Sequence, residues 1–240
     1  MSGALPSPAT EFIRELRALT GRRRRWEVFA DFCETATMSI ASWVDRRPER
    51  VARYQAALHR YSVSEGAAFG RMLGCAALGV SLSTDMLGGV FEELGLAEHW
   101  EGQFFSPMDV CRATVRVAVD PLDAHRRVEA AGFVIAFDPA CGAGALPIAL
   151  AGWLAESGLN PQRHLHVTAV DLDRVAAQMA YIQLSLLGIP AVVRIGDTLL
   201  EEMAEEFRTP MHLLGRWDRR LAGRAGTSTD VQLLTERMTR

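Results

Sequence analysis

The chain contains no lysine, so all 26 of its basic residues are arginine. This absence excludes every mechanism in which a lysine amine acts as a nucleophile or forms a Schiff base. The four cysteines, Cys33, Cys75, Cys111 and Cys141, are widely spaced and form no Cys-X-X-Cys pair or Cys/His cluster. We therefore expect reduced thiols and no metal site.

Long hydrophobic runs are also absent. The most apolar stretch, residues 66–80, is interrupted by Arg71 and is too short to cross a bilayer. The first ten residues lack the charged and apolar regions of a signal peptide, so we expect a cytoplasmic protein with no membrane partner. The net charge of −3 predicts no overall attraction to nucleic acid. With 49% hydrophobic residues, a chain of 240 residues can bury a sizeable core.

The N-terminal part, residues 1–101, is predicted to form a helical domain. Apolar residues recur in it at helical spacing, and strand-like alternation is nearly absent. The predicted helices cover residues 11–19, 26–43, 48–61, 64–78 and 85–94.

The remaining residues, 102–240, are predicted to form an α/β domain. Ser106 and Pro107 are typical of the N-cap and first residue of a helix, which we expect to run to about residue 119. Beyond it, strands 133–137, 166–170 and 191–195 alternate with helices 143–155 and 174–187. Such alternation predicts parallel strands joined by crossover helices. Residues 199–207 and 212–221 are predicted to be helical.

The most informative segment is residues 138–144, Asp-Pro-Ala-Cys-Gly-Ala-Gly, which directly follows a buried strand. The absent side chains of Gly142 and Gly144 allow the backbone to approach a ligand closely. Cofactors of doubly wound α/β folds bind in the crevice at such a strand end. The second strand ends in Asp171 and the third in the pair Gly196-Asp197.

Taken in order, these features resemble the motifs of N6-adenine DNA methyltransferases, in particular the modification subunit of type I restriction-modification systems. Residues 103–107 are similar to the family's Gln-Phe-Phe-Thr-Pro element, with serine in place of threonine. Residues 138–144 are similar to its Asp-Pro-Ala-Cys-Gly-Ser-Gly loop, with Ala143 in place of serine. The resemblance covers about residues 85–200. It implies a helical N-terminal domain followed by a truncated, Rossmann-like methyltransferase domain.

The resemblance also implies that S-adenosylmethionine binds at these strand ends. Asp138 would meet the cationic methionine part, Asp171 the two ribose hydroxyls, and Asp197 the adenine amino group. Each feature taken alone also fits an ordinary turn or helix cap, and their order favours a cofactor site. The implied cofactor-binding residues are Phe104, Ser106, Pro107, Asp138, Pro139, Ala140, Cys141, Gly142, Gly144, Asp171, Leu172, Asp197 and Thr198.

One family motif is absent from the sequence, namely the Asn/Asp-Pro-Pro-Tyr/Phe element that holds the target amino group and stacks on the flipped base. The pairs at residues 120–121 and 160–161 lack the second proline and the aromatic residue. The catalytic residues are therefore unknown. A methyltransferase that needs a partner chain for its catalytic half and for DNA contact is one hypothesis. The alternatives are a catalytically silent S-adenosylmethionine-binding or assembly protein that regulates or mimics a restriction-modification system, and a remnant that binds nothing.

Without the later strands of the family's sheet, the first strand would have an open apolar edge, which invites pairing. We expect the C-terminal segment to fold over this edge, or a second chain to cover it in a homo- or hetero-oligomer. Leu213, Leu214, Trp217 and Leu221 are candidates for this packing, and ordinary packing of a tail helix on its own domain gives the same pattern.

Two groups of arginines are candidates for contacts with DNA phosphates, or simply for solvated faces. One is the run Arg22–Arg25. The other lies in the tail and comprises Arg216, Arg219, Arg220 and Arg224.

Overall fold

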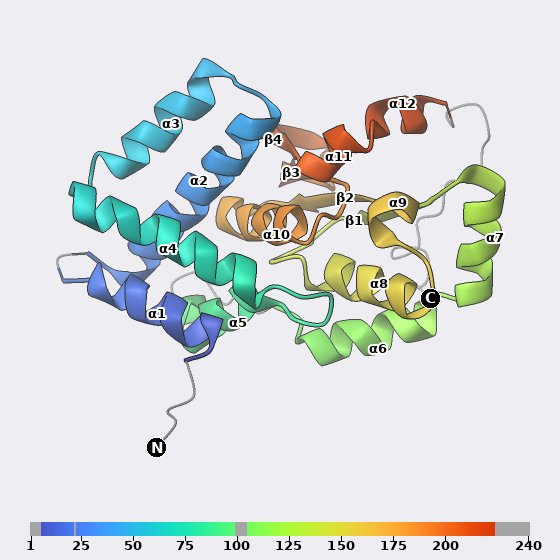
Figure 1. Ribbon diagram of the computed structural model, residues 1–240, viewed down its shortest axis with the longest axis horizontal. Coiled ribbons are helices and arrows are strands. Elements are labelled where there is room, and N and C mark those ends of the chain that lie inside the picture. The colour runs from blue at the N-terminus through green and yellow to red at the C-terminus, as the bar shows by residue number, and fades with distance from the viewer. Residues whose placement is uncertain (1–5, 22, 99–104, 224–240) are drawn as a thin grey trace.

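The computed structural model describes residues 6–21, 23–98 and 105–223 (Figure 1). Its α-helices are α1 Pro8–Ala18, α2 Arg25–Val44, α3 Pro48–Leu58, α4 Val63–Gly79, α5 Met86–Glu93, α6 Met108–Ala118, α7 Pro121–Ala131, α8 Ala145–Glu156, α9 Pro161–His164, α10 Arg174–Leu186, α11 Pro210–Leu214 and α12 Trp217–Ala222. A 3₁₀ helix, η1, covers Leu96–Glu98, and the strands are β1 Val134–Asp138, β2 Leu165–Asp171, β3 Ala191–Asp197 and β4 Glu202–Arg208.

The four strands form one sheet in the order β1-β2-β3-β4. The first three strands are parallel, and α8 and α10 are the crossover helices between them. The predicted α/β fold and its three parallel strands are thus confirmed. Because β1, β2 and β3 run in the same direction, their carboxyl ends lie at one edge of the sheet, where the three acidic residues occur.

The prediction of a helix over residues 199–207 is wrong, because this segment contains most of β4, which is antiparallel to β3. Its residues favour helices by intrinsic propensity, but long-range contacts determine the structure. Phe207 lies against Tyr181 of α10, with 5.4 Å between the ring centroids. Glu205 forms ion pairs with Arg53 of α3 and Arg174 of α10, at 2.8 and 2.7 Å.

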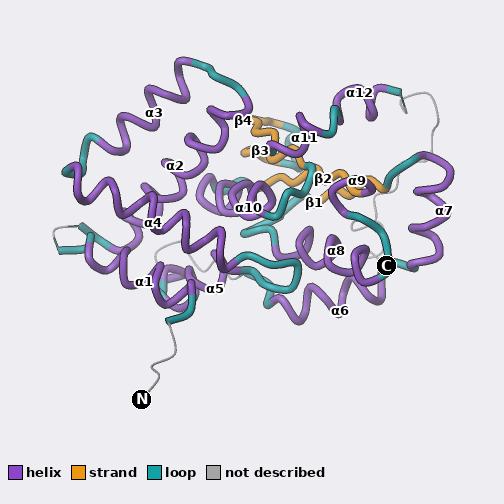
Figure 2. The backbone as a smooth tube through the Cα atoms, viewed as in Figure 1, coloured by secondary structure: helices purple, strands orange, loops and turns teal. Residues whose placement is uncertain are grey.

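One face of the sheet packs on α8 and α10. Alternate strand residues, among them Val134, Val167 and Val193, share a core cluster with side chains of these helices. On the side of α10 away from the sheet, Met179 and Ile182 belong to a second cluster with the N-terminal helices. Figure 2 shows α10 between the sheet and helices α2 and α4. The helical and α/β parts thus share α10 as a common layer, and a domain boundary at residues 101–102 stays a prediction.

Helices α11 and α12 pack on the other face of the sheet, at the start of the strands. Trp217 is 0% exposed, and its ring centroid lies 4.9 Å from that of Phe133 and 5.2 Å from that of His166. Trp217 is thus packed on the face of the sheet near the start of β1, whereas no described residue of the tail pairs with the β1 edge, so the covering of this edge stays a prediction. The prediction that Leu213 and Leu214 take part in this packing is wrong, since they are 40% and 77% exposed because the helix breaks between α11 and α12, whereas Leu221 is half-buried.

A chain of polar contacts also holds the tail. The Nε2 atom of His166 lies 3.0 Å from Nδ1 of His212, whose Nε2 lies 3.0 Å from a carboxylate oxygen of Asp218. Burial lowers the pKa of His166 to about 3, so this imidazole is neutral at physiological pH. His166 and His212 thus join the tail to the start of β2.

The rest of this face is less covered than the face that packs on α8 and α10. Ile135, Phe137 and Thr168 are half-buried there, and β1 is one edge of the sheet. Within the three described ranges, no helix is long and apolar enough to span a membrane.

The tail packing leads to a first prediction. Replacing Trp217 by alanine should lower the free energy of unfolding by about 4 kcal/mol, because it empties a large buried site. Replacing Leu214, which is exposed, should change it by less than about 0.5 kcal/mol. Urea denaturation of both variants checks this, and similar losses in the two would contradict the packing described.

Candidate cofactor site

The loop after β1 is anchored to the end of β2. The backbone N–H of Cys141 donates to the carbonyl of Val170 at 2.9 Å, and the N–H of Gly144 donates to the carbonyl of Cys141 at 2.8 Å. Gly142 and Gly144 have φ of +53° and +93°, values at which a side chain is strained. The turn therefore requires glycine at both positions.

Asp171 ties the ends of β1 and β2 together. Its Oδ2 accepts the N–H of Gly142 at 2.7 Å, and its Oδ1 accepts the N–H of Asp173 at 2.9 Å. Burial raises the pKa of Asp171, while these two hydrogen bonds lower it. Each carboxylate oxygen keeps a free acceptor site, because a carboxylate oxygen can accept two hydrogen bonds.

Asp138 has an unusual environment for a carboxylate. The residue is 5% exposed, its Oδ1 accepts the N–H of Ala140 at 3.3 Å, and its Oδ2 is buried with no hydrogen-bond partner among the described residues. Burial, with a smaller contribution from the nearby charge of Asp171, raises the pKa of Asp138 to about 6. A buried and unsatisfied carboxylate oxygen is costly, and a polar or cationic ligand at this position would remove the cost.

The loop after β3 joins the same site. The hydroxyl of Thr198 donates to the carbonyl of Pro139 at 2.8 Å. Asp197 is half-buried, and its Oδ1 accepts the N–H groups of Leu199 and Leu200 at 2.8 and 3.1 Å. The carboxyl ends of β1, β2 and β3 therefore contribute to one site through Asp138, Asp171 and Asp197.

The other predicted residues of the β1 and β2 loops differ in exposure. Pro139 is half-buried and Ala140 is exposed, whereas Cys141 is 6% exposed. Burial raises the pKa of the Cys141 thiol far above its usual value, so this cysteine is not a thiolate at neutral pH. Leu172 is 72% exposed beside Asp171, where it offers an apolar surface.

The segment before α6 reaches the glycine turn through a residue that the sequence analysis missed. A Cβ atom added to Gly142 would lie 2.8 Å from the ring of Phe105, so this ring packs directly on the turn. The predicted contact Phe104 lies outside the described residues. Ser106 and Pro107 are exposed, and the N-cap of α6 is Pro107 rather than Ser106, since the helix begins one residue later than predicted.

Gln183 of α10 is a second residue that was missed. Its amide nitrogen donates to Asp85 at 2.7 Å and to the carbonyl of Ala143 in the glycine turn at 2.8 Å, and its oxygen accepts the N–H of Leu87 at 3.1 Å. Gln183 is 0% exposed and thus connects the turn to the start of α5. The available signal was a glutamine within an otherwise apolar helical run.

Replacing Gln183 by leucine should therefore lower the free energy of unfolding by about 2 kcal/mol, because Asp85 and Ala143 lose a buried hydrogen-bond donor. The exposed Gln55 on α3 provides the control, where the same change should have an effect below about 0.5 kcal/mol. Urea denaturation of the two variants measures the difference. Equal stability of both would show that Gln183 does not hold the turn.

Acidic, histidine and cysteine side chains form no cluster suited to a metal ion in the part of the chain that the structure describes. The polar groups of the site are instead carboxylates and backbone amides at three strand ends. Such an arrangement suits an organic ligand that carries positive charge and hydroxyl groups.

A sequence family and a solved structure are similar to this chain. A sequence model of the family described as N-6 DNA Methylase matches residues 83–214, and no curated protein matches the chain. A solved structure described as a putative class I S-adenosylmethionine-dependent methyltransferase from Listeria monocytogenes is similar, with 15% sequence identity and a TM-score of 0.44. The alignment covers 82% of this chain but only 56% of that one, so the chain spans little more than half of its length. Because the family match includes more than half of its residues, the chain belongs to the N-6 DNA methylase family.

Proposed function

We propose that the loops after β1, β2 and β3 bind S-adenosylmethionine, and that the chain is the cofactor-binding part of an N6-adenine DNA methyltransferase. One observation carries the proposal. The glycine turn hydrogen-bonds to Asp171 at 2.7 Å, while Asp138 beside it has a buried carboxylate oxygen that no described residue hydrogen-bonds. The site thus has one unsatisfied negative group and one carboxylate with free acceptor positions.

The residues present fit this cofactor. Asp138 would accept the cationic methionine part, which removes the cost of its buried oxygen, and Asp171 would accept the ribose hydroxyls with its free acceptor positions. Asp197 would accept the adenine amino group, with Leu172 and Thr198 beside the ring. When bound, S-adenosylmethionine supplies an activated methyl group for in-line displacement. The contribution of the chain is to position this group.

Catalysis also needs a group that holds the target adenine, and we propose that a partner chain supplies it. The sequence has no Asn/Asp-Pro-Pro-aromatic motif. The sheet supports a second chain at the same place, since β1 is an edge strand and Ile135 and Phe137 are half-buried. A partner that continued the sheet beside β1 would cover these side chains and place its own motif next to the glycine turn.

The absence of the motif also favours a second candidate, a catalytically silent S-adenosylmethionine-binding protein that regulates or mimics a restriction-modification system. Transfer of a labelled methyl group from S-adenosylmethionine to DNA separates the two. The test compares the chain alone with the chain co-expressed with a methylase-like protein encoded beside it. Transfer that requires both chains and disappears in Asp171→Ala supports the first proposal. Cofactor binding without transfer in either arm supports the second.

A further inference from the structure

We propose that a surface made by Arg163, Arg216, Arg219 and Arg220, the arginine surface, binds the phosphate backbone of duplex DNA. It lies at the start of the strands, whereas the cofactor loops lie at their ends. The inference rests on the proposed function only for the identity of the ligand, since that function makes DNA the expected polyanion. The positive charge of the surface is inferred separately, from the ion pairs and hydrogen bonds of the described residues.

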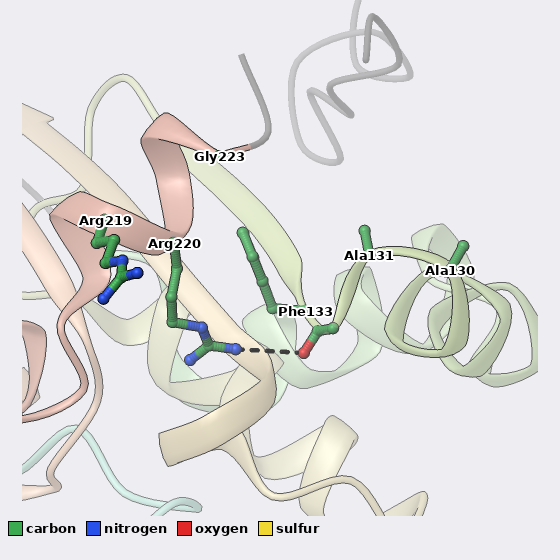
Figure 3. Close-up of a pocket in the computed structure, with 7 residues that line it drawn as sticks. Ala130, Ala131, Phe133, Arg219, Arg220 and Gly223 are labelled. Atoms are coloured by element: carbon green, nitrogen blue, oxygen red, sulfur yellow. Dashed lines mark hydrogen bonds between the residues drawn. The ribbon is translucent and has the colours of Figure 1, made fainter. Parts of the chain in front are cut away.

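The four arginines come from two elements, α12 with the residue before it and α9. Arg219 and Arg220 lie in α12, and Arg216 is the residue directly before this helix. Arg220 connects α12 to α9, because its Nη2 donates to the backbone carbonyl of Arg163 at 2.8 Å. The same atom donates to the carbonyl of Gly132 at 3.3 Å, as Figure 3 shows beside Phe133 and Arg219.

Arg220 is the structural centre of this surface. Its guanidinium lies 3.7 Å from the ring centroid of the buried Trp217 and 4.9 Å from that of Phe133. The two ring contacts and the two hydrogen bonds to carbonyl groups hold the guanidinium of Arg220 in place. Arg163, Arg216 and Arg219 are exposed around it and are free to contact a ligand.

The positive charge of the arginine surface is not balanced by acidic side chains. Across the described residues, none of its four arginines has a carboxylate within 4.0 Å, whereas Arg53, Arg71 and Arg116 elsewhere all form ion pairs. The acidic residue of α12, Asp218, contacts His212 at 3.0 Å and Arg208 at 3.6 Å. A chain with a net charge of −3 therefore carries a local excess of positive charge.

The other basic run, residues 22–25, differs because two of its arginines have partners within the protein. Arg23 forms an ion pair with Glu65 at 3.1 Å, and Arg25 donates to the carbonyl of Leu94 at 3.1 Å. These side chains serve the packing of the N-terminal helices. The observations therefore favour the tail over this run.

Exposed arginines that lack carboxylates match the phosphates of DNA, since the guanidinium binds a phosphate through two parallel hydrogen bonds. Such contacts position a duplex without reading its sequence. β1 has five residues and is roughly 17 Å long, which is about half a turn of B-DNA. Contact at the arginine surface would thus hold the duplex about half a turn away from the strand ends.

The test reverses the charge of two exposed arginines, Arg216→Glu with Arg219→Glu. The control reverses Arg17→Glu with Arg46→Glu, two exposed arginines without described carboxylate partners outside this surface. Both double variants change the net charge equally. Fluorescence anisotropy measures binding of a labelled 30-base-pair duplex from about 50 to 200 mM salt, without cofactor. Thermal unfolding by circular dichroism confirms that both variants fold.

We expect the tail variant to bind DNA at least roughly tenfold more weakly at 50 mM salt, with the slope of log affinity against log salt reduced by about 2. The control should bind as the wild type does within about twofold, and Arg163→Glu should weaken binding in the same direction as the tail variant. Equal weakening by both double variants, or no binding by the wild type, would overturn the proposal. The DNA-binding assay contains no cofactor, so its outcome does not depend on whether the chain binds S-adenosylmethionine. Failure of this proposal and failure of the proposed function can therefore be distinguished.

Discussion

Replacing Asp138 by asparagine is expected to raise the free energy of unfolding by about 2 kcal/mol at pH 8 and to weaken S-adenosylmethionine binding tenfold or more. A carboxyl whose pKa rises from 3.8 to about 6 costs about 3 kcal/mol when it is ionised in the folded protein. Asparagine carries no charge, and its own buried amide offsets part of this gain. The wild type is less stable than this variant because it keeps an ionised carboxylate buried at the cofactor site.

The sign of the pH dependence follows from the raised pKa. Protonated Asp138 favours the folded state, so its contribution is fully present below pH 3.8 and is lost as the pH rises through about 6. The asparagine variant should therefore equal the wild type in stability near pH 4 and exceed it above pH 7. Urea denaturation at several pH values measures this difference.

Binding of a cationic ligand should show the opposite trend. Because the ligand meets ionised Asp138, the affinity of the wild type should rise by up to about tenfold per pH unit below pH 6 and level off above pH 7. Calorimetry in buffers of different ionisation enthalpy should show release of a proton near pH 6. The same pH profile in Asp138→Asn would mean that Asp138 does not contact the cation.

Replacing Gly142 by alanine is expected to weaken cofactor binding at least roughly thirtyfold. The residue has φ of +53°, and an added Cβ would lie 2.8 Å from the ring of Phe105. An alanine there therefore carries about 1 kcal/mol of backbone strain and must also displace either the ring or the turn. Since the N–H of Gly142 binds Asp171, a displaced turn also moves this carboxylate.

Gly158 is the matched control. It has φ of +84°, and an added Cβ would meet no atom within 4 Å. Gly158→Ala should thus cost a similar strain, visible in urea denaturation, and leave cofactor affinity unchanged in calorimetry. If both alanine variants lost affinity to the same extent, the loss would come from general destabilisation and not from the glycine turn.

The parts of the fold that local pattern determines were predictable from the sequence. The apolar strand before Asp138 is β1, and the strands before Asp171 and Asp197 are β2 and β3. Parallel strands place their carboxyl ends at one edge, so the meeting of the three acids followed from topology alone. The contact between Thr198 and Pro139 is a consequence of the same arrangement.

The features that were missed depend on contacts between distant residues. β4 consists of helix-forming residues that pair with β3 because Glu205 and Phe207 find partners on α3 and α10. The role of Gln183 depends on Asp85, which lies almost a hundred residues earlier in the chain. Hydrophobic periodicity contains no information about such pairs, so the sequence alone could not reveal them.

The C-terminal tail contains one feature that the sequence pattern predicted and one that it did not. Its apolar spacing indicated side chains that pack on the domain, and Trp217 is buried against Phe133. The spacing assumed one continuous helix, but Arg216 adopts φ of +51° and separates α11 from α12. This break exposes Leu214 and places Arg216 and Arg219 at the surface.

The most direct test of the account is a calorimetric titration of S-adenosylmethionine into the wild type, Asp171→Ala and the control Asp120→Ala. Asp120 caps α7 through the N–H of Leu122, so its loss costs about 1 kcal/mol of stability outside the site. The account predicts binding by the wild type and the control, and at least roughly a hundredfold loss in Asp171→Ala, because the variant loses both the ribose acceptor and the anchor of Gly142. No binding by the wild type, or undiminished binding by Asp171→Ala, would contradict it.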